Sequence, residues 1–122
     1  MAKYFDDSLP TKANHVFQEA EDGAARILVP EIVIGEFVYI ALKGRLESRD
    51  PSALIAELLD ELSVSAFLQQ VSISKAAWQG LLQSDIPELH DRMIHAIAEA
   101  ESAEAIITND AQLRASGFRT IW

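Results

Sequence analysis

The sequence predicts an α/β domain with a mostly parallel sheet, and three observations carry this prediction. Short apolar runs with β-branched residues, such as Ile27-Leu28-Val29 and Ala105-Ile106-Ile107-Thr108, have the length of buried strands. Segments with apolar residues at helical spacing alternate with these runs along the chain, as in α/β proteins. The 122 residues contain no internal repeat, low-complexity tract or long linker, so a single domain over residues 1–122 is expected.

The composition excludes several classes of protein. Ten Lys and Arg residues stand against 19 Asp and Glu residues, and the formal net charge is -9. This charge argues against a protein that binds nucleic acid mainly by neutralising phosphates, but it allows carboxylates to hold divalent cations that meet the phosphates. The absence of cysteine excludes disulfides, thiolate zinc sites and cysteine nucleophiles. There is no apolar run of membrane-spanning length and no signal-peptide core, so we expect a cytoplasmic protein without a membrane partner.

The first half of the chain predicts three helices and two strands. Lys12–Asp22 has apolar residues at helical spacing, and Ile27-Leu28-Val29 is a strand that ends at a proline. The run Ile32–Leu42 is long enough for a helix and apolar nearly all round, which predicts a central, buried helix. A third helix begins at Pro51 and carries leucines on one face as far as Leu62. A second strand is expected at about Gln70–Ile73.

The second half repeats the alternation with shorter elements. The segment Asp85-Ile86-Pro87-Glu88 predicts a helix start, with Asp85 as the cap and Glu88 three residues later as in a capping box. That helix is expected to run to about Ser102. The other expected elements are a helix at Lys75–Gln83, a strand at Ala105–Thr108, a helix at Asp110–Ala115 and a last strand at Phe118–Trp122.

Three acids stand out by their positions. Glu36 lies within the apolar helix, where a carboxylate is costly unless it is paired, bound to metal or at a cleft edge; the alternative is a helix edge that faces water. Asp91 is expected in the second turn of the Asp85 helix, and a solvated surface acid is the alternative. Asp110 follows a strand, and its alternative role is to cap the next helix. His95 lies one turn after Asp91, where a surface or packing role is the simpler interpretation.

Together, the three acids suggest a cation site. Each comes from a different element, and the carboxyl ends of parallel strands meet at the sheet edge where ligands bind. Clustered carboxylates repel one another, so a divalent cation normally neutralises them. Mg²⁺ and Mn²⁺ prefer such oxygen ligands, and these ions activate water against phosphodiesters.

Three segments in this order resemble a PIN domain, most closely the VapC-type toxin ribonucleases. They are Val29-Pro30-Glu31-Ile32-Val33-Ile34-Gly35-Glu36-Phe37-Val38-Tyr39, Leu89-His90-Asp91-Arg92-Met93-Ile94 and Ile106-Ile107-Thr108-Asn109-Asp110. The resemblance covers the chain from Lys12 to Trp122. It implies a Rossmann-like α/β/α sandwich and a Mg²⁺- or Mn²⁺-dependent ribonuclease of a toxin–antitoxin pair, with RNA as substrate, an antitoxin as partner and a homodimer as the assembly.

The resemblance also assigns residues. It implies that Glu36, Asp91 and Asp110 are the metal-binding and catalytic acids, and that Thr108 is the small hydroxyl residue that supports Asp110. Family members often carry a further acid two residues after the position of Asp110. Here that residue is Gln112, so this ligand is missing.

The N-terminus departs further from the family pattern. PIN domains begin with a central strand that ends in the first metal-binding aspartate, whereas Tyr4–Pro10 is more similar to the loop after the first helix. On this interpretation the first strand and its aspartate are missing. The alternative is that Lys3-Tyr4-Phe5 is a shortened strand and that Asp6 or Asp7 replaces the aspartate. If the strand is missing, another strand or a partner chain must cover the edge.

Three functions therefore remain open. The first is a metal-dependent ribonuclease, in which Lys43, Arg45 and Arg49 steer RNA unless they only solvate a turn. The second is a catalytically impaired PIN-like protein that acts by binding a partner or a second copy of itself through its apolar helices. The third is an acidic α/β domain whose carboxylates only keep it in solution.

Overall fold

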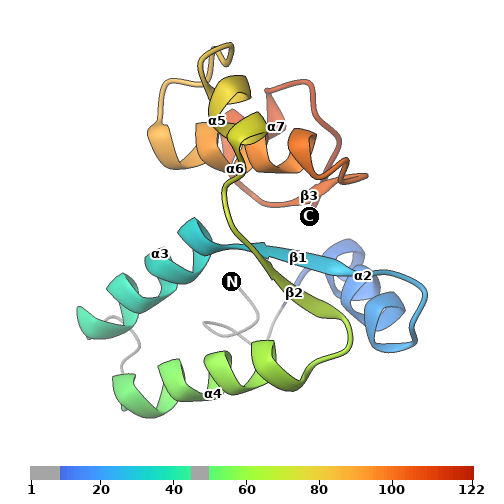
Figure 1. The fold of residues 1–122 in the computed structure, drawn as a ribbon. Coiled ribbons are helices and arrows are strands. Elements are labelled where there is room, and N and C mark those ends of the chain that lie inside the picture. Colours follow the sequence, from blue (N-terminus) through green and yellow to red (C-terminus); the bar gives the residue numbers. More distant parts are fainter. Residues whose placement is uncertain (1–8, 45–49) are drawn as a thin grey trace. The chain divides into compact units, whose positions relative to one another are not determined.

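The computed structural model describes residues 9–44 and 50–122. These residues group into two compact units: Leu9 and His15–Val71 belong to unit 1, and Pro10–Asn14 together with Ser72–Trp122 belong to unit 2. In each unit, helices alternate with short strands that pair in parallel (Figure 1). The predicted α/β class is therefore confirmed.

Unit 1 is built on two parallel strands, β1 (Ile27–Pro30) and β2 (Leu68–Val71). They pair residue for residue from Ile27 opposite Leu68 to Pro30 opposite Val71. A parallel pair needs a long crossover, and here α3 (Glu31–Leu42) and α4 (Pro51–Val64) form it. Helix α2 (Thr11–Glu21), which precedes β1, has the bounds that the sequence predicts to within one residue.

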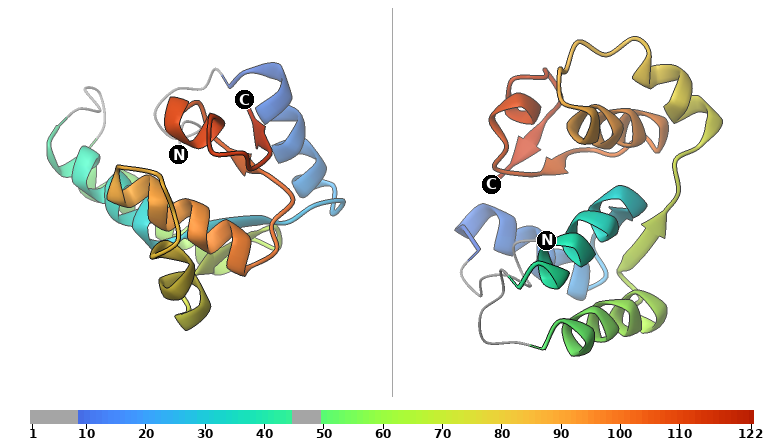
Figure 2. Two further views of the ribbon diagram at one scale, coloured as in Figure 1. Left: turned by 90° about the horizontal axis from the view of Figure 1, so that it is seen from above. Right: turned by 90° about the vertical axis from the view of Figure 1, so that its left-hand side faces the viewer.

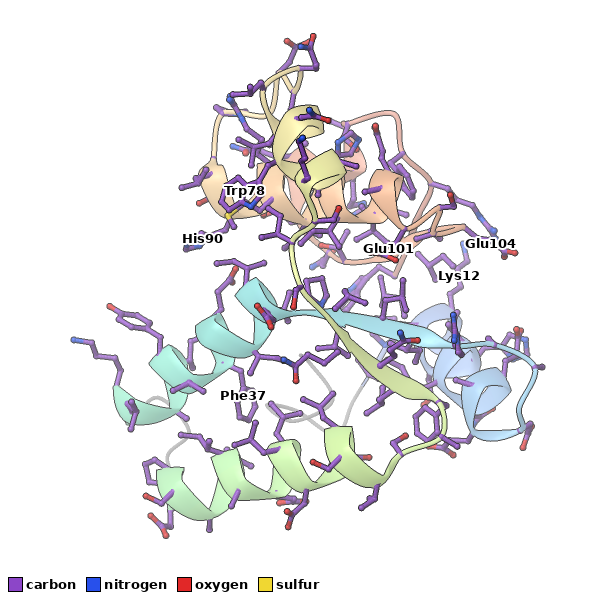
Figure 3. The ribbon with its side chains drawn as sticks, in the orientation of Figure 1. Lys12, Phe37, Trp78, His90, Glu101 and Glu104 are labelled. Carbon is purple, nitrogen blue, oxygen red and sulfur yellow. The ribbon has the colours of Figure 1, made fainter. Side chains whose placement is uncertain are left out.

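The core of unit 1 lies between α3 and α4. Phe37, Leu54 and Leu58 are almost fully buried there, and Figure 3 shows Phe37 extending from α3 toward α4. The expectation that α3 is buried all round is wrong, because Tyr39 is 56% exposed and Leu42 is 67% exposed. One face of α3 packs against α4, and the apolar residues beyond that face are left in contact with solvent.

Unit 2 contains three helices and a second pair of parallel strands (Figure 2). Its elements are α5 (Lys75–Leu81), α6 (Leu89–Ala100), β3 (Ile106–Ile107), α7 (Ala111–Arg114) and β4 (Thr120–Ile121). Buried Ile86, Ala98, Ile106 and Leu113 form its core. The core thus joins β3 to the helices on either side of it in the sequence, and it fixes the position at which β3 ends.

Helix α6 begins later than the sequence predicts. Glu88 is its N-cap and accepts a hydrogen bond from the backbone N–H of Asp91, so the expectation that Asp85 is the cap is wrong. The physical reason is tertiary: Ile86 is buried in the core, and Arg92 Nε donates to its carbonyl oxygen at 2.6 Å. These contacts hold the segment before Glu88 outside the helix. Asp91 consequently lies in the first turn of α6 rather than in the second.

Strand β2 also lies two residues earlier than the predicted Gln70–Ile73. The hydroxyl of Ser65 accepts hydrogen bonds from the backbone N–H groups of Phe67 and Leu68, which turns the chain directly after α4. The strand can then start at once, with Leu68 and Val71 buried.

Some expectations fall outside the residues that the structure describes. These are the shortened strand Lys3-Tyr4-Phe5, the candidate acids Asp6 and Asp7, and the turn residues Arg45 and Arg49. Within residues 9–44 and 50–122, no helix is long and apolar enough to cross a membrane.

Candidate metal centre

Asp110 stands immediately after β3 and caps α7. Its Oδ1 accepts hydrogen bonds from the backbone N–H groups of Gln112 at 2.9 Å and Leu113 at 3.2 Å. The predicted capping role is therefore confirmed. Both of these bonds use Oδ1, so the cap leaves Oδ2 of this exposed residue for another ligand. The cap fixes the carboxylate at the C-terminal end of a parallel strand, where α/β proteins bind ligands.

Thr108 connects the end of β3 to β4 by a backbone hydrogen bond. Its backbone N–H donates to the carbonyl oxygen of Ile121 at 3.1 Å, which continues the pairing of β3 with β4. Its Oγ1 accepts a hydrogen bond from the backbone N–H of Asp110 at 3.0 Å. The predicted contact between Thr108 and Asp110 is thus present, and it holds the backbone rather than the carboxylate of Asp110.

A further acid, Glu88, caps α6 beside Asp91. The hydrogen bond from the N–H of Asp91 lowers the pKa of Glu88 below its usual 4.5, and the N–H of His90 acts in the same direction. Desolvation and the negative charge of Asp110 oppose this shift. The capping-box pattern places Glu88 three residues into the helix, whereas its Glu-x-x-Asp spacing to Asp91 is the signal that Glu88 itself is the cap and that both acids stand at the start of one helix.

Asp91 is half-buried in the first turn of α6. Its backbone N–H is held by Glu88 Oε2 at 2.8 Å, which fixes the helix start from which its side chain extends. Unit 2 therefore supplies two of the three predicted site acids, Asp91 and Asp110, together with Glu88.

Glu36 belongs to unit 1. It lies in α3, which begins directly after β1, and its side chain is half-buried with the Oε1 atom enclosed. Its neighbour in sequence, Phe37, is fixed in the core of this unit. The N-terminal end of α3 is anchored as well, because Glu31 Oε1 accepts a hydrogen bond from Gln70 Nε2 of β2 at 3.1 Å. The predicted alternative of a helix edge that simply faces water does not describe Glu36, since one of its oxygens is enclosed.

The donor chemistry fits Mg²⁺ or Mn²⁺, because Glu36, Asp91 and Asp110 all offer carboxylate oxygens. Among residues 9–44 and 50–122, no three His, Cys, Asp or Glu side chains are grouped as they would be to hold a metal ion. With only two carboxylates, water would have to supply more of the ligands.

His95 has a packing role. Its ring meets Phe118 edge to face at a centroid distance of 5.7 Å, and its Nε2 lies 3.1 Å from Glu99 Oε1. These contacts agree with the predicted packing role of His95.

Lys43 is the one described member of the predicted basic turn, and its ammonium group lies 5.4 Å from the centroid of the Tyr39 ring.

A comparison with known families gives a match to the PIN domain over residues 4–118. No curated protein and no solved structure matches the chain. The matched segment runs through both units and contains Glu36, Asp91 and Asp110, the acids that the sequence analysis selected. Because the match spans nearly the whole length, the chain belongs to the PIN domain family, whose members are generally divalent-metal-dependent nucleases that act on RNA or DNA.

Proposed function

We propose that this protein is a metal-dependent ribonuclease of toxin–antitoxin type that hydrolyses RNA phosphodiesters. One observation supports the proposal above the others: in a chain of the PIN family, a capped aspartate at the end of a parallel strand keeps an oxygen for a cation. The chain is strongly acidic, so binding of a polyanion at this strand end calls for a cation between carboxylates and phosphates.

Glu36, Asp91 and Asp110 would hold the Mg²⁺ or Mn²⁺ ion. When bound, such an ion supplies Lewis-acid polarisation of a phosphodiester and lowers the pKa of a water molecule. The residues of the chain position the ligands. The cap of α7 orients the Asp110 carboxylate, Thr108 fixes its backbone, and the Glu88 cap fixes the helix turn that carries Asp91.

A toxin of this kind acts with an antitoxin and as a homodimer, and we propose both partners for this chain. Exposed apolar side chains support a partner surface, since isolated monomers rarely leave such groups together in solvent. In unit 1 they lie on α3 and α4: Tyr39, Leu42, Leu59 and Val64 are each between 47% and 81% exposed.

The same surface favours a second candidate, a PIN-like protein with impaired catalysis that acts by binding a partner or a second copy. Gln112 strengthens this alternative, because it is an amide at a position where the family often has another acid. In the structure, its backbone N–H donates to Asp110 Oδ1, so its place beside the site is fixed.

The test is cleavage of a single-stranded RNA in Mn²⁺ by the parent and by Glu36→Gln, Asp91→Asn and Asp110→Asn, each purified identically. Asp85→Asn is the matched control, because Asp85 is an exposed acid of unit 2 that caps no helix. The ribonuclease proposal predicts metal-dependent cleavage by the parent and the control, and strong loss in the other three.

Equal activity in all five proteins would show that the cleavage does not come from this site. No activity in any of them, combined with a stable dimer that Tyr39→Ser or Leu42→Ser disrupts, would support the second candidate instead.

A further inference from the structure

We propose that a cationic hollow in unit 2 binds one nucleotide of a single-stranded RNA, with the phosphate on its basic side chains and the base on Trp122. The hollow is lined by Lys12, Arg114, Arg119, Thr120, Ile121 and Trp122, and its volume is about 460 Å³. All six residues belong to unit 2. The inference rests on the proposed ribonuclease function and names a substrate-binding site outside the acids.

The charge of the hollow is unusual for this chain. Half of its lining residues are Lys or Arg, although the whole chain has only ten such residues and a net charge of -9. Among the described residues, the ion pairs involve other side chains, and Lys12, Arg114 and Arg119 form none with a carboxylate. Lys12, Arg114 and Arg119 thus give the hollow an excess of positive side-chain charge, which favours an anionic ligand.

Hydrogen bonds to β3 fix the backbone of the hollow. The carbonyl oxygen of Arg119 accepts from the N–H of Ile106 at 2.9 Å, and that of Ile121 accepts from the N–H of Thr108 at 3.1 Å. Arg114 Nη1 donates to Asn109 Oδ1 at 3.3 Å. The hollow thus lies next to the end of β3, which Asp110 follows. An RNA strand bound at Asp110 would therefore have this cationic hollow within its reach.

The lining chemistry suits a nucleotide better than a free anion. Arg presents several N–H donors that match the oxygens of a phosphate, and a Lys ammonium adds a point charge. The half-buried indole of Trp122 offers a flat face for base stacking, which is tolerant of sequence. The volume lies in the range of sites for small molecules, and it is larger than a phosphate alone needs.

The first test measures binding of a fluorescent single-stranded oligoribonucleotide of about ten residues in EDTA, which prevents metal-dependent cleavage. The variant is Arg114→Gln with Arg119→Gln. The control, Arg26→Gln with Lys75→Gln, makes the same change in net charge at exposed cations elsewhere. We expect the variant to lose at least about 10-fold in affinity and its salt dependence to fall by about 0.7 per lost phosphate contact, with little change in the control.

The second test reads the stacking directly. In a Trp78→Phe background, Trp122 is the remaining tryptophan, so quenching of its fluorescence by the oligonucleotide reports contact. Trp122→Leu should weaken binding roughly 5- to 150-fold. Inorganic phosphate and polyglutamate serve as competing anions. Quenching by either of these but not by RNA would overturn the assignment to RNA.

Equal RNA affinity and salt dependence in the arginine variant and its control would overturn the inference, even if the protein cleaves RNA. Conversely, a parent that binds RNA through these arginines but never cleaves it would contradict the proposed ribonuclease and leave the binding site standing. The two proposals can therefore fail separately.

Discussion

Asp110 has two separable roles, and a pair of substitutions distinguishes them. Its Oδ1 accepts two backbone N–H bonds at the start of α7, a helix of four residues that carries the buried Leu113. Asp110→Ala removes the cap and should cost about 1 kcal/mol of unfolding free energy. For a chain of this length, this cost corresponds to a fall in Tm of about 3–5 °C.

Asp110→Asn keeps an oxygen at the capping position, and Asn is as good an N-cap as Asp. We therefore expect a Tm close to that of the parent. The charge that would bind the cation is lost, however. Loss of groups that only support a metal ligand typically costs 10- to 100-fold, so loss of a ligand itself should reduce Mn²⁺-dependent RNA cleavage by about 100-fold or more.

The assays are thermal unfolding followed by circular dichroism and initial rates of RNA cleavage across Mn²⁺ concentrations. A stable but inactive Asn variant, with an Ala variant that is both inactive and less stable, agrees with the two roles. An Asn variant as active as the parent would refute the metal role, and an Ala variant as stable as the parent would refute the capping role.

Three further predictions concern the supports of the site and the core. The pKa of Glu88 is lower in the folded chain than its unfolded value of about 4.5. Its contribution to the free energy of unfolding is therefore complete above about pH 4.5 and is lost as the pH falls through the lower folded value. Glu88→Gln should accordingly make the free energy of unfolding depend less on pH in acid. Thr108→Val removes the acceptor for the Asp110 N–H and should cost about 0.5–1.5 kcal/mol by urea unfolding, whereas Thr108→Ser should restore most of it. Leu58 is fully buried in unit 1, so Leu58→Ala should cost about 2–5 kcal/mol, while Leu59→Ala, at a position that is 47% exposed, should cost clearly less; equal costs would contradict the packing of α4.

Much of the fold could be predicted from local patterns. The periodicity of α2, α3 and α4 and the β-branched runs at β1 and β3 agree with the structure, because each of these segments has a strong pattern and a clear stop. The cap at Asp110 was also predictable, since an acid between an apolar strand and a short helix has few other roles.

The errors share a physical cause, which is that tertiary contacts override local signals. The capping-box pattern at Asp85 competes with burial of Ile86 and with the hydrogen bond from Arg92, and the tertiary contacts determine where α6 begins. Similarly, the apolar composition of α3 predicts burial, but only one of its faces has a helix to pack against.

In the candidate site, too, local patterns predict some features and tertiary packing determines the others. Sequence position selects Glu36 within an apolar helix and Asp110 after a strand, whereas Asp91 is selected by its place near the start of a helix and by the resemblance to a PIN domain. The lowered pKa of Glu88 depends on the backbone N–H groups at the true start of α6, which the predicted cap at Asp85 misplaces. The basic hollow around Arg114 and Arg119 likewise combines residues from separate segments of the chain, so no single segment predicts it.

The central proposal is that Glu36, Asp91 and Asp110 are ligands of a divalent cation. Paramagnetic broadening of backbone amide signals during a Mn²⁺ titration tests this claim most directly. We predict that amide signals near Glu36, Asp91 and Asp110 broaden as Mn²⁺ is added, and that Asp110→Asn, but not the control Asp85→Asn, weakens the broadening near residue 110. Broadening that is absent near these acids, or unchanged in Asp110→Asn, would contradict their role as metal ligands.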